Sequence, residues 1–439
     1  MKVALLCHDD VAELDRRVVA FARFFATRGW EAIIVCTTRL PVPVTKDLGG
    51  GVKVQAVSAR NLRATWDPGF HRLRDLPGYV ADRLLTILPP VAARMARRLG
   101  GRWKRLRDRV RRSAFGEPNA EETPRIVGHP LPFSSVLFEG ARQIDASLLI
   151  ACDLPALPAA ARLSRRNDVP LIYDSHEFYA EQVAFDDRQR QALVRQERAA
   201  LAAVDLAITV SPEIAAQLSR RYPEGPEFEV IFNAPEFSVD DSRRVVARNH
   251  LGVSPGRRLA IYHGGFLRSR NLENLVDGAK RLDGDGFSLL LLGYGDADWL
   301  RCRAEGCKHI HVHSAVPQSE LPAWVGDCDL CVIPYGAVDL NTRLALPNKL
   351  FDAVALGVPV LVNECLESAS GLVAEYGIGW SGDLSSPHAV EATLRACLER
   401  LDTHPQMETN FSRARAELSW PRQEQHLEQW LAQLEIPGP

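Results

Sequence analysis

Short apolar runs alternate with helical patterns along almost the whole chain. The first apolar run, residues 2–7, precedes a helical pattern that extends from Leu14 to Arg28. Gly29 ends this pattern, and residues 31–37 form the next apolar run. Alternation of this kind is typical of parallel β-strands joined by crossover helices. The sequence therefore predicts an α/β fold.

The predicted strands fall into two series. Further strands of the first series are expected at residues 52–57, 147–153, 170–176, 206–211 and 229–233. Those of the second series are expected at residues 258–264, 288–295, 309–316, 330–336 and 358–364. We expect two Rossmann-like domains that face each other across a crevice. The predicted organisation is an N-terminal domain over 1–235, a linker over 236–256, a C-terminal domain over 257–415, and a helix within 416–439 that crosses back to the N-terminal domain.

Polar residues follow several of these strands directly. They are Asp153, His176, Ser211 and Asn233. Open parallel sheets bind ligands at the carboxyl ends of their strands. In the segment DSHE, Asp174 and Glu177 lie beside His176. A histidine there could hold a sugar or relay a proton, although a single histidine is as often structural.

The segment Leu346–Val360 (LPNKLFDAVALGVPV) reads as a helix followed by a strand. Pro347 suits the first turn of a helix and Gly357 its end. Such a helix start offers free backbone N–H groups to an anion such as a diphosphate. Lys349 would add a mobile positive charge, and Asp352 could accept hydrogen bonds from a sugar diol. The spacing fits a plain surface helix with a Lys–Asp pair equally well.

A glycine pair forms the second candidate site element. The strand ending in His263 leads into Gly264 and Gly265, and a helix is expected to begin near Asn271. Paired glycines allow a ligand to approach the backbone closely. Between these points the chain carries two arginines, Arg268 and Arg270, whose side chains could neutralise phosphate oxygens.

Composition indicates a globular chain of more than one domain. The 439 residues are 46% hydrophobic and 25% charged. The chain contains no uncharged apolar run of about 18 residues, so we expect no transmembrane helix. The N-terminal apolar run meets acidic residues and lacks a small-residue cleavage site, which favours a first strand over a signal peptide. We expect a cytoplasmic protein.

The nine cysteines are odd in number and scattered, which argues against a disulfide framework. One cluster could bind zinc; it comprises Cys302, Cys307, Cys328 and Cys331, with His309, His311 and His313 between them. Cys328 and Cys331 lie in an apolar run, CDLCVIPY, that reads as a buried strand. We favour the core interpretation and expect no metal site.

Residues 61–120 interrupt the first series with a strongly basic segment. It contains 14 Arg and Lys against five Asp and Glu, whereas the whole chain has a net charge of −2. Within 91–112, Met95, Leu99 and Trp103 recur at helix spacing. A basic amphipathic helix suits an anionic membrane surface, and a helix packed on its own domain fits equally well. Nucleic acid is a third interpretation, which we do not expect.

Together these motifs resemble the retaining nucleotide-sugar glycosyltransferases of the GT-B fold, in particular glycosyltransferase family 4. The matching segments are HGGFLRSR, PNKLFD with ALGVPV, DSHE, TVS, FNAPE and LLGYGD. The resemblance implies hexosyl transfer with retained configuration, without a metal or cofactor. It also implies a nucleotide-sugar donor, for which a UDP-sugar is favoured and a GDP-sugar is the alternative. The implied acceptor is a glycan or a lipid-linked intermediate of surface polysaccharide biosynthesis.

The resemblance also implies roles for individual residues. Catalytic roles fall on His176, Arg270 and Lys349. Donor-binding roles fall on Gly264, Gly265, Arg268, Gly293, Val316, Pro347, Asn348 and Asp352, with Lys349 near the diphosphate and Asp352 at the ribose. Acceptor-side roles fall on Asp15, Arg16, Asp174 and Glu177.

The sequence departs from the family pattern at three places, one of which is Gly264–Gly265, where the family has a Gly-Arg pair. The first acid of the family's paired glutamates is replaced by Leu344, and HDDVAELDRR stands where a Gly-Gly loop is usual, so Asp15 and Arg16 take its place. Two alternatives remain: an epimerase, which would share the fold, and a non-catalytic nucleotide-binding partner, which Leu344 and the altered first loop suggest. A peripheral position on the inner face of the cell membrane is the alternative to a purely cytoplasmic one.

Overall fold

The computed structural model describes residues 1–11, 14–38, 43–58, 133–237, 246–401 and 406–434. The basic insertion predicted at about 61–120 lies outside the described residues, as does its amphipathic segment 91–112. The membrane interpretation rests on that segment and is therefore not tested by the structure.

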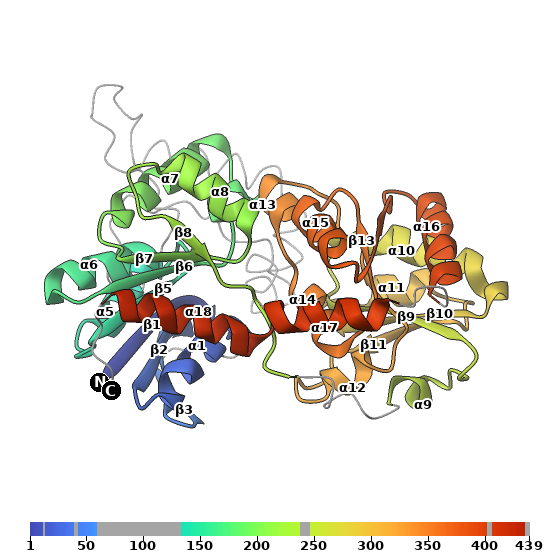
Figure 1. The fold of residues 1–439 in the computed structure, drawn as a ribbon, viewed down its shortest axis with the longest axis horizontal. Helices are drawn as coiled ribbons and strands as arrows, with labels where there is room; N and C mark the ends of the chain where they lie inside the picture. Colours follow the sequence, from blue (N-terminus) through green and yellow to red (C-terminus); the bar gives the residue numbers. More distant parts are fainter. Residues whose placement is uncertain (12–13, 39–42, 59–132, 238–245, 402–405, 435–439) are drawn as a thin grey trace, which may run out of the picture. The chain divides into compact units, whose positions relative to one another are not determined.

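The first series of strands forms an eight-stranded sheet in the order β3-β4-β2-β1-β5-β6-β7-β8 (Figure 1). Its strands are β1 (Lys2–Asp10), β2 (Glu31–Thr38), β3 (Val44–Gly49), β4 (Val52–Ser58), β5 (Leu148–Cys152), β6 (Leu171–Ser175), β7 (Leu206–Thr209) and β8 (Phe228–Val230). All neighbours pair in parallel except β3 and β4, which are antiparallel. The strand order reverses between β1 and β5, and sheets of this kind bind ligands at that point.

The second series forms a parallel six-stranded sheet in the order β11-β10-β9-β12-β13-β14. Its strands are β9 (Arg258–Gly265), β10 (Phe287–Tyr294), β11 (Ile310–Ser314), β12 (Leu330–Ile333), β13 (Val360–Asn363) and β14 (Gly379–Gly382). Numbered along the chain this is the Rossmann order 3-2-1-4-5-6, with its switch point between β9 and β12. The prediction of two Rossmann-like sheets is confirmed.

Helices join the strands and cover the sheets. Those of the first half are α1 (Arg16–Thr27), α5 (Phe133–Ala141), α6 (Leu157–Asn167), α7 (Asp187–Leu201) and α8 (Pro212–Arg221). Those that follow are α9 (Ala247–Leu251), α10 (Leu272–Ala279), α11 (Asp298–Arg303), α12 (Leu321–Val325), α13 (Leu340–Leu344), α14 (Asn348–Leu356), α15 (Glu367–Tyr376), α16 (Pro387–Arg400), α17 (Met407–Leu418) and α18 (Trp420–Gln433). Within the described residues no helix is long and apolar enough to cross a membrane.

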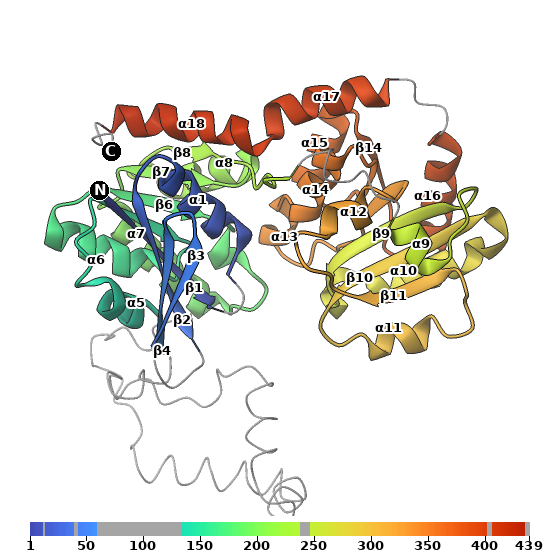
Figure 2. The same cartoon turned by 90° about the horizontal axis from the view of Figure 1, so that it is seen from below.

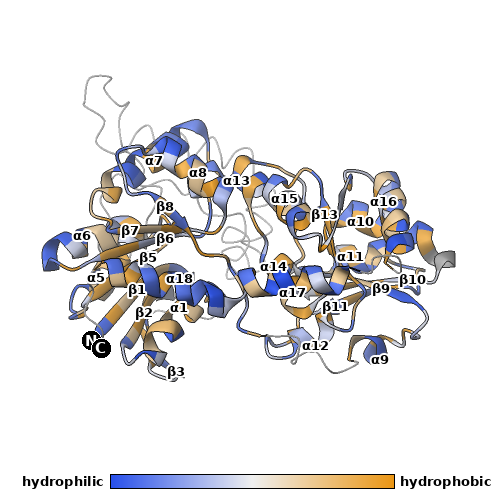
Figure 3. Cartoon of the chain, viewed as in Figure 1, coloured by the Kyte–Doolittle hydropathy of each residue, from blue (hydrophilic) through white to orange (hydrophobic). Residues whose placement is uncertain are grey.

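Each sheet buries both of its faces, because alternate residues of a strand point to opposite sides. In β1, Val3 and Leu5 pack in one apolar core with helix α1, whereas Ala4 and Leu6 pack in another with α5 to α8. Figure 3 shows the result, with apolar strands inside and hydrophilic residues on the outer helix faces. The core of the six-stranded sheet is a separate cluster.

The final helices join the two cores. Helix α17 packs in the core of the six-stranded sheet, and α18 contributes Trp420 and Leu427 to a core of the eight-stranded sheet (Figure 2). The helix predicted within 416–439 corresponds to α18, which begins at Trp420. Pro421 lies in the first turn, where its missing N–H leaves no hydrogen bond unmade.

Other differences concern short or polar elements. Several predicted strands extend beyond the observed carboxyl ends; residues 330–336, for example, contain β12 only as far as Ile333. The edge strands β3 and β14 were not predicted, because their residues are polar or glycine-rich and alternate weakly. Helix α9 lies inside the segment 236–256 that was predicted as a linker.

Candidate functional site

The glycine pair at the end of β9 lies against the start of helix α14. Gly264 has a φ of 127°, and a Cβ placed on it would lie 3.5 Å from Lys349 Nζ. The hydroxyl of Tyr262 donates to the carbonyl of Gly265 over 2.7 Å and holds this pair. Pro347 is the N-cap of α14 and Asn348 its first residue. The 3.5 Å distance to Lys349 Nζ is an ordinary contact, so the positive φ rather than a lack of space favours glycine at position 264.

Lys349 is buried, so the expectation of a mobile charge at this position is wrong. Its side chain lies between two aromatic rings, with Nζ 5.1 Å from the ring centre of Tyr262 and 4.5 Å from that of Tyr335. The ammonium donates to the Tyr335 hydroxyl. Helix periodicity places Lys349 on the inner face of α14, where these rings fix it.

Arg270 reaches the same tyrosine from the turn before α10. Its guanidinium carbon lies 4.0 Å from the centre of the Tyr335 ring. Burial alone would raise the pKa of Tyr335, but the positive charges of Lys349 and Arg270 lower it below its ordinary value. Two cations therefore converge on one phenol at the carboxyl ends of β9 and β12, where an anionic ligand would be stabilised.

Arg268, by contrast, turns towards the surface. It pairs with Glu273 over 2.7 Å and lies 4.7 Å from the ring of Trp299. The structure thus brings Arg270 and Lys349 to one tyrosine and directs Arg268 to a different pair of side chains.

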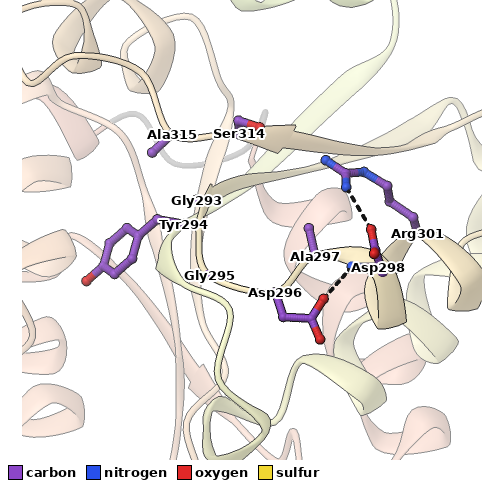
Figure 4. A pocket seen from close by; sticks show the side chains of 9 residues that line it. All are labelled: Gly293, Tyr294, Gly295, Asp296, Ala297, Asp298, Arg301, Ser314 and Ala315. Carbon is purple, nitrogen blue, oxygen red and sulfur yellow. Dashed lines mark hydrogen bonds and ion pairs between the residues drawn. The ribbon is translucent and has the colours of Figure 1, made fainter. Parts of the chain in front are cut away.

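A pocket of about 570 Å³ opens at the carboxyl ends of β10 and β11 (Figure 4). It is lined by Gly293, Tyr294, Gly295, Asp296, Ala297, Asp298, Arg301, Ser314 and Ala315. Arg301 pairs with Asp298, and the Tyr294 ring points away from the loop (Figure 4). Gly293, to which the resemblance gives a donor-binding role, lines this pocket, and Val316, given the same role, lies just past its edge, packed against the core.

Asp352 is held by an arginine of helix α1. Arg16 Nη1 donates to its carboxylate over 2.5 Å, and Nη2 donates to the carbonyls of Asn233 at 3.0 Å and Asn348 at 3.3 Å. His263 Nε2 lies 3.9 Å from the same carboxylate. Burial lowers the pKa of His263 to about 4, so its imidazole is neutral at neutral pH. This group of side chains joins residues from the strand ends of both sheets.

A second polar cluster surrounds His176 at the end of β6. Its Nε2 lies 2.9 Å from the carboxylate of Asp174, and its Nδ1 lies 3.6 Å from that of Asp153. The backbone N–H of His176 donates to Asp153 over 2.8 Å. Asp174 also accepts hydrogen bonds from the buried guanidinium of Arg17 at 2.8 to 3.1 Å. Arg17 therefore fixes Asp174, and both carboxylates fix the imidazole.

The charge states follow from these contacts. Burial alone would lower the pKa of His176, but Asp174 and Asp153 raise it well above its ordinary value. Burial raises the pKa of Asp153 to about 8. Burial would also raise the pKa of Asp174, yet Arg17 and His176 hold it well below its usual range. The cluster therefore presents a protonated imidazole at the sheet edge.

The remaining acceptor-side candidates have mainly local partners. Asp15 is the N-cap of α1 and accepts from the backbone N–H of Arg17 over 2.7 Å. Glu177 accepts from the side chains of Gln182 and Asn341. Leu344, the departure from the family pattern, is buried in the core of the eight-stranded sheet.

The cysteine cluster does not assemble. Cys328 and Cys331 are buried in the core of the six-stranded sheet, whereas Cys302 is exposed. Across the described part of the chain, no group of three or more His, Cys, Asp or Glu side chains is arranged to hold a metal ion.

Residues 257–402 match the family model of the glycosyl transferases group 1. The chain carries a glycosyl transferases group 1 domain. Over 219 residues it is 25% identical to WcaI of Escherichia coli (strain K12), which is named as a colanic acid biosynthesis glycosyl transferase. That alignment spans 46% of this chain and 51% of WcaI, so it covers about half of the length of the curated relative.

Solved structures establish the fold around the group 1 domain. Sucrose-phosphate synthase from Thermosynechococcus elongatus superimposes with a TM-score of 0.67 at 16% identity, covering 99% of this chain and 98% of that one. Anabaena HepE in complex with UDP-glucose gives 0.62 at 14% identity, covering 99% and 100%. WaaG, a glycosyltransferase involved in lipopolysaccharide biosynthesis, gives 0.57 at 12% identity, covering 94% of each chain. The chain has the GT-B fold.

Two site residues escaped the sequence analysis. Tyr335 of the group 1 domain lies two residues past the end of strand β12, so the strand-end rule that identified His176 could have found it. Arg17 gave a different signal, since it lies within the apolar face of α1 and a charge there predicts a buried partner.

Proposed function

We propose that this chain is a retaining glycosyltransferase that moves a hexosyl group from a nucleotide-sugar donor to a glycan or lipid-linked acceptor in surface polysaccharide biosynthesis. The observation that carries the proposal is the convergence of Lys349 and Arg270 on Tyr335 inside the group 1 domain. A pair of cations near the strand ends, one buried and one half-buried, is suited to a diphosphate. The names of WcaI and WaaG support the polysaccharide context, and the UDP-glucose complex of HepE favours a UDP-sugar over a GDP-sugar.

In this proposal the charge of the leaving diphosphate is balanced by protein side chains. Lys349 and Arg270 stabilise the oxygens that become negative as the sugar departs, and the backbone N–H groups at the start of α14 add to their effect. Because two full positive charges are supplied in this way, we propose that the reaction needs no metal ion. The nucleobase would occupy the pocket beside Gly293.

His176 is the candidate group on the acceptor side. Its imidazole is protonated and its Nε2–H is engaged by Asp174, so only the Nδ1–H, 3.6 Å from Asp153, can donate a hydrogen bond to a sugar oxygen. The protonated ring cannot accept a proton. We therefore assign it an orienting role. The proton of the attacking hydroxyl would pass to the departing phosphate, on the same face of the sugar, which retains the anomeric configuration.

We place this activity in the cytoplasm, with the inner face of the cell membrane as the site where the basic residues 91–112 would hold the enzyme. Their composition supports this assignment through attraction to anionic lipids.

The first test is a thermal-shift screen of the full chain with UDP-, GDP- and ADP-sugars. A donor at 100 times its Kd stabilises the folded state by about 2.7 kcal/mol. The donor that shifts Tm is then incubated with the protein, and release of nucleoside diphosphate is measured with and without acceptor glycans. Absence of turnover above background would support the non-catalytic alternative, and an epimerised donor would support the epimerase.

The second test distinguishes the loss of a site residue from a loss of folding. Arg270→Ala and Lys349→Met should each lower donor turnover by about 10²-fold or more, because each removes one charge from the leaving group. Arg281→Ala is the matched control, since Arg281 belongs to the same domain and pairs with Glu391 at the surface. Circular dichroism checks that all three variants fold. Unchanged turnover in both site variants would refute the assignment.

A further inference from the structure

Two histidines meet beside strand β11, outside the candidate donor site. His313 lies on β11, and His250 lies on the short helix α9. Their Nε2 atoms are 3.2 Å apart, and their rings stand nearly perpendicular at 85°. Both nitrogens therefore face the same point in space.

The ring of His313 is oriented by its other nitrogen. Nδ1 lies 2.6 Å from the carbonyl oxygen of Ser314, which can only accept, so Nδ1 carries the proton. The lone pair of a neutral His313 is consequently on Nε2, the atom that faces His250. Histidines that bind metals typically donate their second ring N–H to a backbone carbonyl in this way.

The spacing of the two nitrogens is that of a chelating pair. Zinc binds imidazole nitrogens at about 2.0–2.1 Å, which places two such ligands about 2.9 Å apart at a right angle and about 3.4 Å apart at a tetrahedral angle. The observed 3.2 Å falls between these limits. A metal ion could enter without movement of the backbone.

The surrounding residues hold both rings in place. Trp324 is buried, and its indole lies 4.8 Å from the ring of His313 and 5.2 Å from that of His250. Helix α9 is fixed through Arg248, whose backbone N–H donates to Asp327 over 2.8 Å and whose guanidinium pairs with Asp329. The pair is thus preorganised on one side and, because His250 is exposed, open to solvent on the other.

We infer that His250 and His313 form a binding site for a divalent transition-metal ion, with water in the remaining coordination positions. Imidazole nitrogens suit zinc, copper and nickel, and copper binds such ligands most strongly. The site is separate from the proposed transferase chemistry. The site connects α9 to strand β11, whose last residue, Ser314, lines the pocket described above.

Zinc titration of the tag-free full chain, stripped of metal beforehand, tests this inference. Isothermal calorimetry should show a site that is lost when either histidine is replaced. His250→Asn and His313→Asn should each lower the zinc affinity at least about 10-fold, since removal of even an outer-shell partner costs that much. His388→Asn is the control, because that side chain is 86% exposed and lies elsewhere in the six-stranded half. It should bind zinc as the wild type does.

Copper(II) electron paramagnetic resonance gives a second readout that does not depend on affinity. The spectrum of the wild type should show coupling to two imidazole nitrogens, and each single variant should show one. Equal zinc affinity in the wild type and both site variants would overturn the inference, as would a copper spectrum that neither replacement changes. The two histidines would then share only a hydrogen bond. Neither measurement depends on donor turnover, so its outcome does not test the transferase proposal.

Discussion

The guanidinium of Arg16 donates a 2.5 Å hydrogen bond to the carboxylate of Asp352, although 336 positions separate the two residues in the sequence. The Asp352 side chain is only 2% exposed, and Arg16 covers it. The family resemblance associates Asp352 with the ribose of the donor. If that role is correct, a ribose can reach the carboxylate only by displacing Arg16, so donor binding would be coupled to the release of this ion pair.

Replacement of Arg16 by methionine should destabilise the protein. The substitution leaves a buried carboxylate without its charged partner, which costs about 3–5 kcal/mol in comparable buried pairs. Denaturant unfolding measures the loss. Arg23→Met is the control, because Arg23 pairs with Glu236 at the surface and such pairs contribute about 1 kcal/mol or less. Addition of Asp352→Asn to the Arg16→Met variant should restore part of the stability; no restoration would show that the ion pair is not the cause.

Asp153 should make a contribution to the stability of the fold that falls as the pH rises from about 4 to about 8. The pKa of Asp153 is raised from 3.8 to about 8, so in this window the folded state retains a proton that the unfolded chain has released. The stability that Asp153 contributes is fully present below about pH 4. It decreases as the pH rises towards the folded-state pKa of about 8, with a slope of up to about 1.4 kcal/mol per pH unit, and is lost above that pKa. His263, whose pKa is lowered to about 4, contributes a slope of the opposite sign up to its ordinary value of 6.5.

Asp153→Asn should flatten this pH dependence. Asparagine does not titrate, accepts the hydrogen bond from the His176 N–H, and tolerates the positive φ of 65° at this position. The raised pKa of His176 gives a slope of the same sign above its ordinary value of 6.5, so a residual slope there is expected. Unfolding free energies from pH 4 to pH 8 test this, with Asp145→Asn, an exposed aspartate, as the control. Parallel profiles for wild type and Asp153→Asn would contradict the assignment.

Gly293 and Gly371 should respond to alanine in opposite directions. Gly293 pairs with Gly264 across β10 and β9, and a Cβ on Gly293 would lie 1.9 Å from the Gly264 carbonyl oxygen. Gly293→Ala should therefore lower the free energy of unfolding by about 1–3 kcal/mol. Gly371 is exposed within helix α15 and has open space around it, so Gly371→Ala should raise stability by about 0.5–1 kcal/mol. Thermal melts compare the two, and a neutral Gly293→Ala would show that β9 and β10 can separate.

The architecture was predictable because its information is local. Strand β10 is a continuous apolar run that is buried on both faces, and its pattern alone identifies it. The strand-end positions of Asp153 and His176 followed from the same runs. Strand β3 was missed because its residues lie at an exposed sheet edge and mix charged and apolar side chains without clear alternation.

The partners within the site were not predictable, since they join residues distant in sequence. The motif around Lys349 indicates a helix start but not that the ammonium is enclosed by Tyr262 and Tyr335. Nor does the pair Asp15–Arg16 reveal that one residue caps a helix while the other reaches Asp352. Such contacts depend on how the strand ends meet, which no local pattern encodes.

Tyr335 should ionise at a lower pH than an ordinary tyrosine. Burial opposes ionisation, but Lys349 and Arg270 favour the phenolate and bring the pKa below 10. Spectrophotometric titration should show an early component that disappears in Tyr335→Phe and persists in Tyr294→Phe, because Tyr294 is 68% exposed. A nucleoside diphosphate bound by the two cations would neutralise them, so its addition should shift this component to higher pH. If Tyr335→Phe left the titration curve unchanged, the two cations would not act on this phenol, and the diphosphate assignment would lose its main support.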